Sequence, residues 1–425
     1  MTALPAGLAG YRAPARPVAH PATLPDVAER LFAGAVLLFL SEALLGPLLN
    51  PAQSNDAAPV LRTMWVPIYG LIALACTARI AVLPRVFWGA VALLPLLLLA
   101  GISTQWSILP DFTLRRTVAL GFTSLFGLYL AARFDWRELI GLLAGVFLIL
   151  ALGSYASVLV APNWAITQDI HQGAWKALWF QKNALGQMMA WGTLTCGCAA
   201  LFDPARRRLW CAGAVLCALL VICSTSKTGL LALLLVGAGL ASVAGFRRGG
   251  VWRVATAWLV VVGGAVTLSA VVFAPGLVLE ALGKDPTLTG RTDIWDAVLR
   301  RVNERPWQGY GYGAFWENKQ GPLQYVRREV DWNVPTAHNG WLELLLSFGW
   351  TGVIVFAAHL ALTTVAALAS LGRGPQAYWA PAAVGLFVLY SLSESSIMQH
   401  NNLVWALYVM TSAKLLQVRE PAPPR

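Results

Sequence analysis

Charged residues are scarce in this chain. Asp, Glu, Lys and Arg make up 12% of its 425 residues, whereas hydrophobic residues make up 57%. The mean hydropathy of +0.62 lies far outside the range of soluble domains, which excludes a water-soluble globule of this length. We therefore expect an integral membrane protein whose partners include membrane lipid, and we expect no nucleic-acid partner.

The apolar segments also lack the alternation of polar and apolar residues that marks membrane strands. A strand of an outer-membrane barrel shows this alternation over about 10 residues, but the segments here are continuously apolar and rich in Leu and Ala. A bilayer core about 30 Å thick requires roughly 20 apolar residues per helix, and runs of that length recur along the chain. The sequence therefore predicts an all-α membrane bundle and excludes a barrel.

Disulfide, metal-binding and leader signals are missing as well. The six cysteines all lie in apolar stretches, where a thiol behaves as a small hydrophobic group. The predicted outer loops contain no DxD pair, no HExxH string and no histidine cluster, so we expect neither a metal nor a cofactor. Residues 1–30 have no small-residue cleavage site behind a short apolar core, and the first apolar segment is expected to be retained.

Twelve apolar ranges are predicted to span the membrane, and no internal repeat accompanies them. They are 31–49, 64–83, 86–102, 113–133, 137–161, 183–203, 207–224, 228–246, 252–273, 340–370, 377–394 and 398–416. Most Lys and Arg residues of the short loops fall on one side of this arrangement, which predicts that both termini are cytoplasmic.

The predicted organisation has five parts. A cytoplasmic tail (1–30) precedes nine spans (31–273), a long periplasmic loop (274–339), three further spans (340–416) and a second cytoplasmic tail (417–425).

The long loop contains a predicted amphipathic helix that begins near Thr292. Its apolar residues share one helical face: Ile294, Trp295, Val298, Leu299 and Val302. This helix is expected to lie on the outer membrane surface, to cap the bundle, or to do both. The string GYGYG that follows (309–313) resembles an ion-channel filter, but it lies in a polar loop, where its glycines are expected to form tight turns.

Cationic residues lie at the outer ends of predicted spans, against the usual charge bias. Arg115 and Arg116 open the fourth span, Lys182 opens the sixth, Lys227 lies in a short connection, and Arg291 precedes the amphipathic helix. An unpaired cation deep in the bilayer costs about 2.5–3.5 kcal/mol on insertion scales. Each residue alone could snorkel to lipid phosphates or pair with a carboxylate. Together on one face they favour a shared anionic ligand, and lipid phosphates lie at that depth.

His338 is the histidine best placed for chemistry. It lies where a polar loop enters an apolar helix, with Asn339 beside it and Glu343 five residues later. An imidazole with an unperturbed pKa near 6.5 can accept a proton from an attacking hydroxyl at neutral pH. The alternative is a histidine that caps the helix or serves only the structure.

Five short strings in a fixed order resemble the O-antigen ligase and polymerase superfamily. They are KNALGQ (Lys182 to Gln187), STSKTG (Ser224 to Gly229), LTGRTDIW (Leu288 to Trp295), GYGYGAF (Gly309 to Phe315) and AHNGWLELLLSFGWTG (Ala337 to Gly352). The correspondence covers roughly residues 170–360. Its most specific elements are the His-Asn pair before a helix that carries FGWTG, and the earlier Gly-Arg pair.

The resemblance implies a class-C-type membrane glycosyltransferase of the bacterial inner membrane with a periplasmic site. It implies a metal-independent transfer that uses an undecaprenyl-pyrophosphate-linked glycan as donor. For a ligase the acceptor would be a hydroxyl of lipid A-core oligosaccharide, and a direct displacement would invert the anomeric configuration. Arg291 would contact the donor phosphates and His338 would be the base, with Lys182 and Lys227 beside the pyrophosphate. The family often has Arg where this chain has Lys227, and a Lys keeps the charge but not the bidentate geometry.

The remaining candidate residues are Asn339 and Glu394, together with Arg115 or Arg116 on the donor. Two related activities stay open at this point, an O-antigen polymerase and a protein O-oligosaccharyltransferase, because the sequence separates acceptors poorly. A transporter of an anionic lipid or solute is a more remote alternative, since transporters place charges at the midplane on broken helices of repeated halves.

Overall fold

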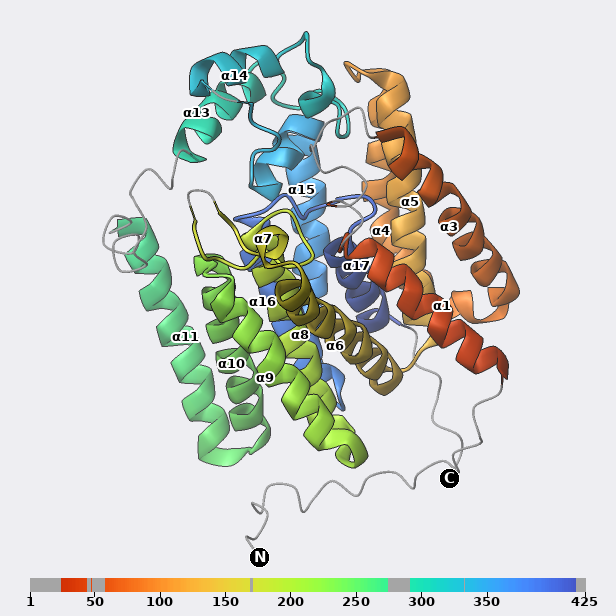
Figure 1. Ribbon diagram of the computed structural model, residues 1–425, viewed down its shortest axis with the longest axis vertical. Helices are drawn as coiled ribbons and strands as arrows, with labels where there is room; N and C mark the ends of the chain where they lie inside the picture. Colours follow the sequence, from red (N-terminus) through yellow and green to blue (C-terminus); the bar gives the residue numbers. More distant parts are fainter. Residues whose placement is uncertain are drawn as a thin grey trace, which may run out of the picture.

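The computed structural model describes residues 24–43, 47, 58–168, 171–273, 291–331 and 333–417. Within these ranges the secondary structure is helical apart from one isolated bridge between Ile166 and Trp175. The first half contains α1 (Leu24–Leu40), α3 (Ala58–Ala78), α4 (Phe87–Ile102), α5 (Pro110–Arg133), α6 (Trp136–Val160), α7 (Pro162–Ala165) and α8 (Lys182–Phe202). The second half contains α9 (Arg207–Cys223), α10 (Lys227–Arg247), α11 (Gly250–Phe273), α13 (Arg291–Val302), α14 (Leu323–Val330), α15 (Gly340–Ala369), α16 (Gln376–Ser391) and α17 (Leu403–Leu415) (Figure 1).

Each predicted span overlaps one of these helices, although the bounds of three helices differ by five residues or more. One of them is α3, which runs from Ala58 to Ala78 where 64–83 was expected. The first helix begins at Leu24 and ends at Leu40, where 31–49 was expected. The last begins at Leu403 because the preceding segment turns sharply, with positive φ at Met398 and Asn401.

Four helical stretches of the described residues are long and apolar enough to cross a bilayer: Ile80–Gln105, Trp136–Val160, Lys227–Arg247 and Gly340–Ala369. The count of twelve crossings and the periplasmic position of the long loop remain predictions.

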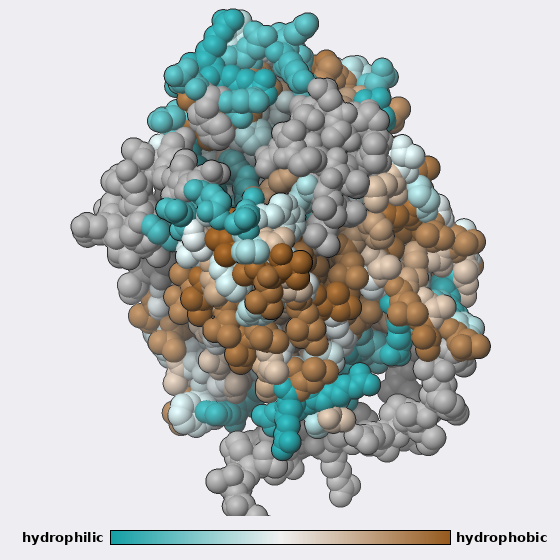
Figure 2. Space-filling model, in the orientation of Figure 1, coloured by the Kyte–Doolittle hydropathy of each residue, from teal (hydrophilic) through white to brown (hydrophobic). Residues whose placement is uncertain are grey.

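An apolar belt crosses the visible face of the molecule between two polar ends (Figure 2). Large apolar side chains are exposed along the helices, for example Leu234 of α10 and Leu259 of α11. In water such a surface would aggregate, whereas in a bilayer it faces lipid tails. The chain is an integral membrane protein on this evidence.

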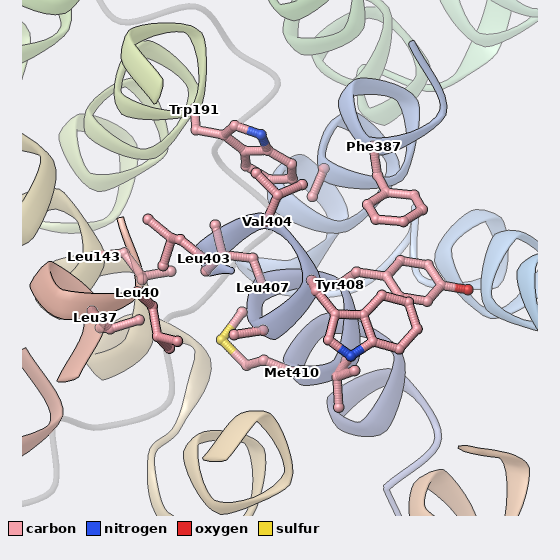
Figure 3. Close-up of a cluster of buried hydrophobic side chains, with 14 of the residues drawn as sticks. Leu37, Leu40, Leu143, Trp191, Phe387, Leu403, Val404, Leu407, Tyr408 and Met410 are labelled. Atoms are coloured by element: carbon pink, nitrogen blue, oxygen red, sulfur yellow. The ribbon is translucent and has the colours of Figure 1, made fainter. Parts of the chain in front are cut away.

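Helix α17 is the central helix of the bundle. Its residues from Leu403 to Ala413 are buried, and they pack among side chains of α1, α6, α8 and α16 (Figure 3). Glycines bring α17 close to two other neighbours, because a Cβ at Gly89 of α4 or Gly127 of α5 would lie within 3 Å of it. Small residues at helix contacts are typical of membrane bundles.

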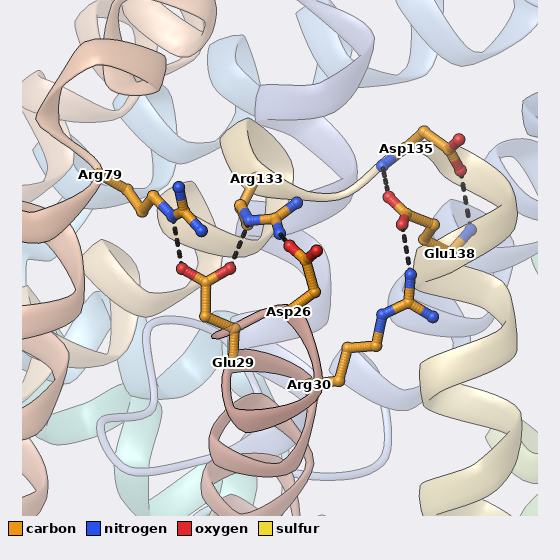
Figure 4. A network of polar contacts seen from close by, with 7 residues as sticks. All are labelled: Asp26, Glu29, Arg30, Arg79, Arg133, Asp135 and Glu138. Carbon is orange, nitrogen blue, oxygen red and sulfur yellow. Dashed lines mark hydrogen bonds and ion pairs between the residues drawn. The ribbon is translucent and has the colours of Figure 1, made fainter. Parts of the chain in front are cut away.

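A network of ion pairs joins four helix ends at the side opposite to α13 and α14. Arg133 of α5 donates to Glu29 at 2.6 Å and to Asp26 at 2.7 Å, and Arg79 also donates to Glu29 (Figure 4). Nearby, Arg30 of α1 pairs with Glu138 of α6. The network fixes α1 against the ends of α5 and α6, on the side that the charge bias predicts to be cytoplasmic.

The helix predicted near Thr292 is α13, and it caps the bundle. Ile294, Val298 and Val302 are buried in a second apolar cluster that includes residues of α14 and the first turns of α15. Leu299, expected on the same face, is 43% exposed, because the buried stripe of α13 is narrower than the predicted apolar face. The apolar face therefore packs on protein, and a membrane-surface position is an untested addition to that role.

Candidate active site

Helix α15 is broken near its beginning, and the break shapes the site. Gly349 has φ 63° and ψ −157°, a conformation that is essentially restricted to glycine. The break allows the chain around Pro306 to cross the helix, since a Cβ at Gly349 would lie 2.3 Å from the Pro306 carbonyl oxygen. The backbone N–H of Trp350 donates to that oxygen at 2.7 Å. A short half-helix, residues 340–348, is thereby separated from the rest of α15.

The glycine-rich string crosses this break. Gly309, Gly311 and Gly313 all have positive φ, as tight turns require. The backbone N–H groups of Tyr310 and Gly311 donate to the carbonyls of Leu346 and Ser347, which the broken helix leaves free. The string is thus a strap that caps the half-helix, in agreement with the turns expected there.

His338 immediately precedes the half-helix. Its backbone lies in the left-handed region at φ 48°, and Asn339 caps the helix by accepting from the N–H groups of Trp341 and Leu342. Trp295 of α13 donates from Nε1 to the carbonyl of Ala337 at 2.9 Å. The amphipathic helix therefore helps to fix the turn that presents the imidazole, which is half-buried.

Glu394 lies between His338 and Arg291. Its Oε2 is 3.7 Å from His338 Nδ1, and its Oε1 is 3.6 Å from Arg291 Nη2. Arg291 also donates from Nη1 to the carbonyl of Ser393 at 2.8 Å. All three side chains remain partly exposed, at 18% for His338 and 22% for the other two. An imidazole, a carboxylate and a guanidinium are thus gathered where a ligand can reach them.

Glu343 connects the segments around this group. Its Oε1 accepts from the Ala337 N–H at 2.8 Å and from Ser395 Oγ at 3.1 Å, and its Oε2 accepts from Trp316 Nε1 at 2.8 Å. Ala337 precedes His338 and Ser395 follows Glu394, so one carboxylate positions both. The sequence marked Glu343 only as an acidic neighbour of His338. One sequence feature could have identified this role: Glu343 is an acidic residue one turn inside an apolar run. A carboxylate in such a place needs several hydrogen-bond donors around it.

Lys182 and Lys227 form a second positive group at the first turns of α8 and α10. Lys182 contacts Thr225 Oγ1 at 3.4 Å. Burial lowers the pKa of Lys182, which precedes the predicted span 183–203, and the charge of Lys227 lowers it further. Burial and the same two lysines also lower the pKa of His171 in the preceding loop. Two cations at the positive ends of two helices strongly favour an anion there.

Contacts one turn into α8 link the lysines to the Glu394 segment. Gln187 Nε2 lies 3.3 Å from Ser396 Oγ, and Tyr390 Oη lies 3.5 Å from the Gly186 carbonyl. A Cβ at Gly186 would lie 2.9 Å from Ser226 Cβ, so α8 also packs tightly on the loop before Lys227. The loop after α16 and the last turn of α16 thus lie against both His338 and the second turn of α8.

Arg115 and Arg116 are placed differently. Arg116 bonds to Glu317 at 2.9 Å, lies over the Phe112 ring and packs against Gly313 of the strap. Arg115 is exposed, with its guanidinium 5.9 Å from the same ring. Arg116 is therefore the member of the pair that faces the loop around the site, and it is joined to that site through Glu317 and the adjacent Trp316.

Two comparisons with known proteins agree with the strings quoted above. A family model described as O-antigen ligase matches residues 212–357, a range that holds Lys227, Arg291 and His338. The chain is also 33% identical over 99 residues to the exopolysaccharide production protein ExoQ of Rhizobium meliloti (strain 1021). That similarity spans 22% of this chain and 22% of the length of ExoQ. The predicted resemblance to the O-antigen ligase and polymerase superfamily is thereby confirmed.

Proposed function

We propose that this chain, which is similar in part to the O-antigen ligase family, is an O-antigen ligase of the bacterial inner membrane. It transfers glycan from undecaprenyl pyrophosphate to a hydroxyl of lipid A-core oligosaccharide at the periplasmic face. The observation that carries this proposal is the grouping of Arg291, Glu394 and His338 around a loop that also contacts α8 one turn after Lys182.

His338 is the base of the proposed reaction. Its Nδ1 faces Glu394, which leaves Nε2 to take the proton of the acceptor hydroxyl. The hydroxyl oxygen then bonds to the anomeric carbon as the bond from that carbon to the pyrophosphate oxygen breaks. The electron pair leaves with the pyrophosphate, and a displacement of this kind inverts the anomeric configuration.

The leaving pyrophosphate is held by fixed cations. Arg291 has its guanidinium oriented by the Ser393 carbonyl and by Glu394, so little reorganisation is needed when charge develops. Lys182 and Lys227 provide two further charges at helix N-termini. In this mechanism cationic side chains do the electrostatic work, and transfer is expected to continue in EDTA.

Reconstitution with a defined lipid-linked glycan and purified lipid A-core tests the donor, the acceptor and the base together. His338→Ala should abolish transfer in a protein that still purifies as a monodisperse species, whereas His20→Ala in the N-terminal tail should not. Wild-type turnover by His338→Ala would remove the base assignment. Strict dependence on a divalent ion would remove the electrostatic role of the cations.

A second candidate function is polymerisation of lipid-linked repeat units, which the similarity to an exopolysaccharide production protein favours. The same donor chemistry then serves a different acceptor, the glycan on a second lipid carrier. A strain that lacks the protein accumulates unattached long polymer if the protein is a ligase, but only single repeats if it is a polymerase.

Two further alternatives have no specific observation in their favour. A protein O-oligosaccharyltransferase would transfer the same glycan to purified protein acceptors. A transporter would not catalyse glycan transfer. Glycan transfer by the purified protein in detergent, where there is no membrane gradient, would therefore exclude a transporter.

A further inference from the structure

A cavity of about 580 Å³ opens at the end of the bundle opposite to the candidate active site. It lies among the last residues of α5, the first of α6, the last of α15, the first of α16 and the last of α17. Its polar and charged lining consists of Arg85, Arg133, Asp135, Glu138, Ser370, Arg373, Gln376, Lys414 and Gln417. None of these residues takes part in the proposed transfer reaction.

The lining contains four cations and two carboxylates, and both carboxylates have local partners. Asp135 Oδ1 accepts from the Glu138 N–H, and Glu138 Oε2 accepts from the Asp135 N–H, which is a capping box at the start of α6. Glu138 also pairs with Arg30 (Figure 4). These acids hold the start of α6, and Arg133 is in turn paired with Asp26 and Glu29. The positive excess of the cavity therefore comes from Arg85, Arg373 and Lys414.

Two further features reinforce that charge. Lys414 Nζ donates to the carbonyl of Ala131 at 2.9 Å and to that of Phe134, so its ammonium is fixed at the end of α5. Helix α16 begins at Gln376, and no side chain caps its first turn. The N–H groups and the positive dipole end of that helix lie at the cavity rim.

Apolar surfaces extend from the cavity toward the belt. Two residues after Arg85, α4 begins with Phe87 and Trp88, which are 54% and 55% exposed. Val365 and Leu368, in the last turns of α15, are exposed as well, and α15 contacts α4. An anion with attached hydrocarbon would meet charge at the cavity and apolar side chains beside it, whereas a free anion would use only the cavity.

We propose that this cavity binds the phosphate headgroup of an anionic phospholipid, whose acyl chains lie against the exposed faces of α4 and α15. Basic pockets between membrane helices on the cytoplasmic side are suited to such headgroups. The ligand would join the ends of five helices and would stabilise the bundle at the end remote from the chemistry. This site does not depend on the proposed transferase activity.

Native mass spectrometry of the full-length protein in detergent tests the proposal. Short-chain phosphatidylglycerol and phosphatidylcholine with the same acyl chains are titrated separately against wild type and against the Arg85→Gln/Arg373→Gln double variant. Wild type should bind phosphatidylglycerol at least tenfold more tightly than phosphatidylcholine, and the double variant should lose about tenfold of that preference. Arg206→Gln/Arg208→Gln, at the same polar end but outside the cavity lining, is the matched control and should keep the preference.

Three results would overturn the proposal: equal binding of the two lipids by wild type, an unchanged preference in the Arg85/Arg373 variant, or an equal loss in the control variant. Inorganic phosphate is the third probe. If it displaces phosphatidylglycerol at equal concentration, the cavity is a site for a free anion and the lipid assignment is wrong. Should the double variant fail to fold, Arg373→Gln alone in an exposed turn gives the same comparison with a smaller expected loss.

Discussion

His338 Nδ1 lies 3.7 Å from Glu394 Oε2. This distance is too long for a hydrogen bond but short enough for a direct charge interaction once the imidazole is protonated. In the proposed reaction the imidazole becomes protonated when it takes a proton from the acceptor hydroxyl, so the carboxylate would act at that moment. Glu394 thereby serves His338 and Arg291 together.

Replacing Glu394 by Gln should slow the chemical step more than it weakens substrate binding. The amide keeps the shape but cannot stabilise the imidazolium, so kcat should fall by about 10- to 100-fold, a part of what a general base contributes. Glu329 pairs with Arg300 within residues 291–331, and Glu329→Gln is the control, which should leave kcat unchanged. Both are measured as turnover of a defined lipid-linked donor. An equal effect of the two substitutions would contradict the role of Glu394.

Glu343 is a positioning residue whose removal should be rescued by a second change. In Glu343→Gln the amide oxygen can replace Oε1, but the amide NH2 then faces the Trp316 N–H. That indole donor is left without an acceptor, which costs about 1–3 kcal/mol of folding stability. We expect lower thermal stability and lower kcat. Adding Trp316→Phe removes the orphaned donor and should restore part of both. A double variant no better than Glu343→Gln would show that Trp316 Nε1 is not the group at fault.

The charge of Lys182 should be lost at a lower pH than that of an ordinary lysine. Burial and the charge of Lys227 lower the pKa of this amine, so its ammonium form is present at low pH and disappears as pH rises through the lowered pKa. The KM for the lipid-linked donor should therefore rise on the alkaline side. Lys182→Arg should abolish that rise in KM because a guanidinium stays charged. The control Lys319→Arg should leave the rise unchanged. Parallel pH profiles for all three proteins would contradict the prediction.

Arg116 and Arg115 should differ although they are adjacent. Arg116→Ala removes the bond to Glu317, which is worth up to about 1 kcal/mol for a partly exposed pair, and loosens the loop that carries Trp316. It should lower Tm and transfer rate together. Arg115→Ala should change stability by no more than about 0.5 kcal/mol. Thermal unfolding and donor turnover are measured on both, and a larger effect of Arg115→Ala would reverse the assignment.

Gly349 should not tolerate a side chain. Alanine in this backbone conformation costs about 1–3 kcal/mol, and its Cβ would collide with the Pro306 carbonyl. We expect Gly349→Ala to lower Tm and to impair transfer, because the strap holds the half-helix that begins after His338. Gly237→Ala in α10, where a Cβ meets nothing within 4 Å, should be neutral or stabilising. If Gly349→Ala changed neither Tm nor transfer, the strap would not be needed to hold the half-helix.

Local sequence determined the class of protein and the positions of its helices. Continuous apolar runs of bilayer length can form only membrane helices, because the backbone must satisfy its own hydrogen bonds in lipid. Boundaries failed where the run gave no local signal, as at Leu40, and where Asn402 caps α17 only after a turn. The cations and His338 were recognisable individually as polar groups at the ends of apolar runs.

The tertiary structure decided which of these residues meet. Glu394 and Trp316 reach the surroundings of His338 and Glu343 from two separate segments, and no periodicity along the chain reports contacts of that kind. The break at Gly349 was equally invisible, since a glycine inside an apolar run is compatible with a continuous helix until another segment must cross it. Hydrophobic patterning is a local property of the chain, whereas the grouping of polar side chains depends on how distant helices pack.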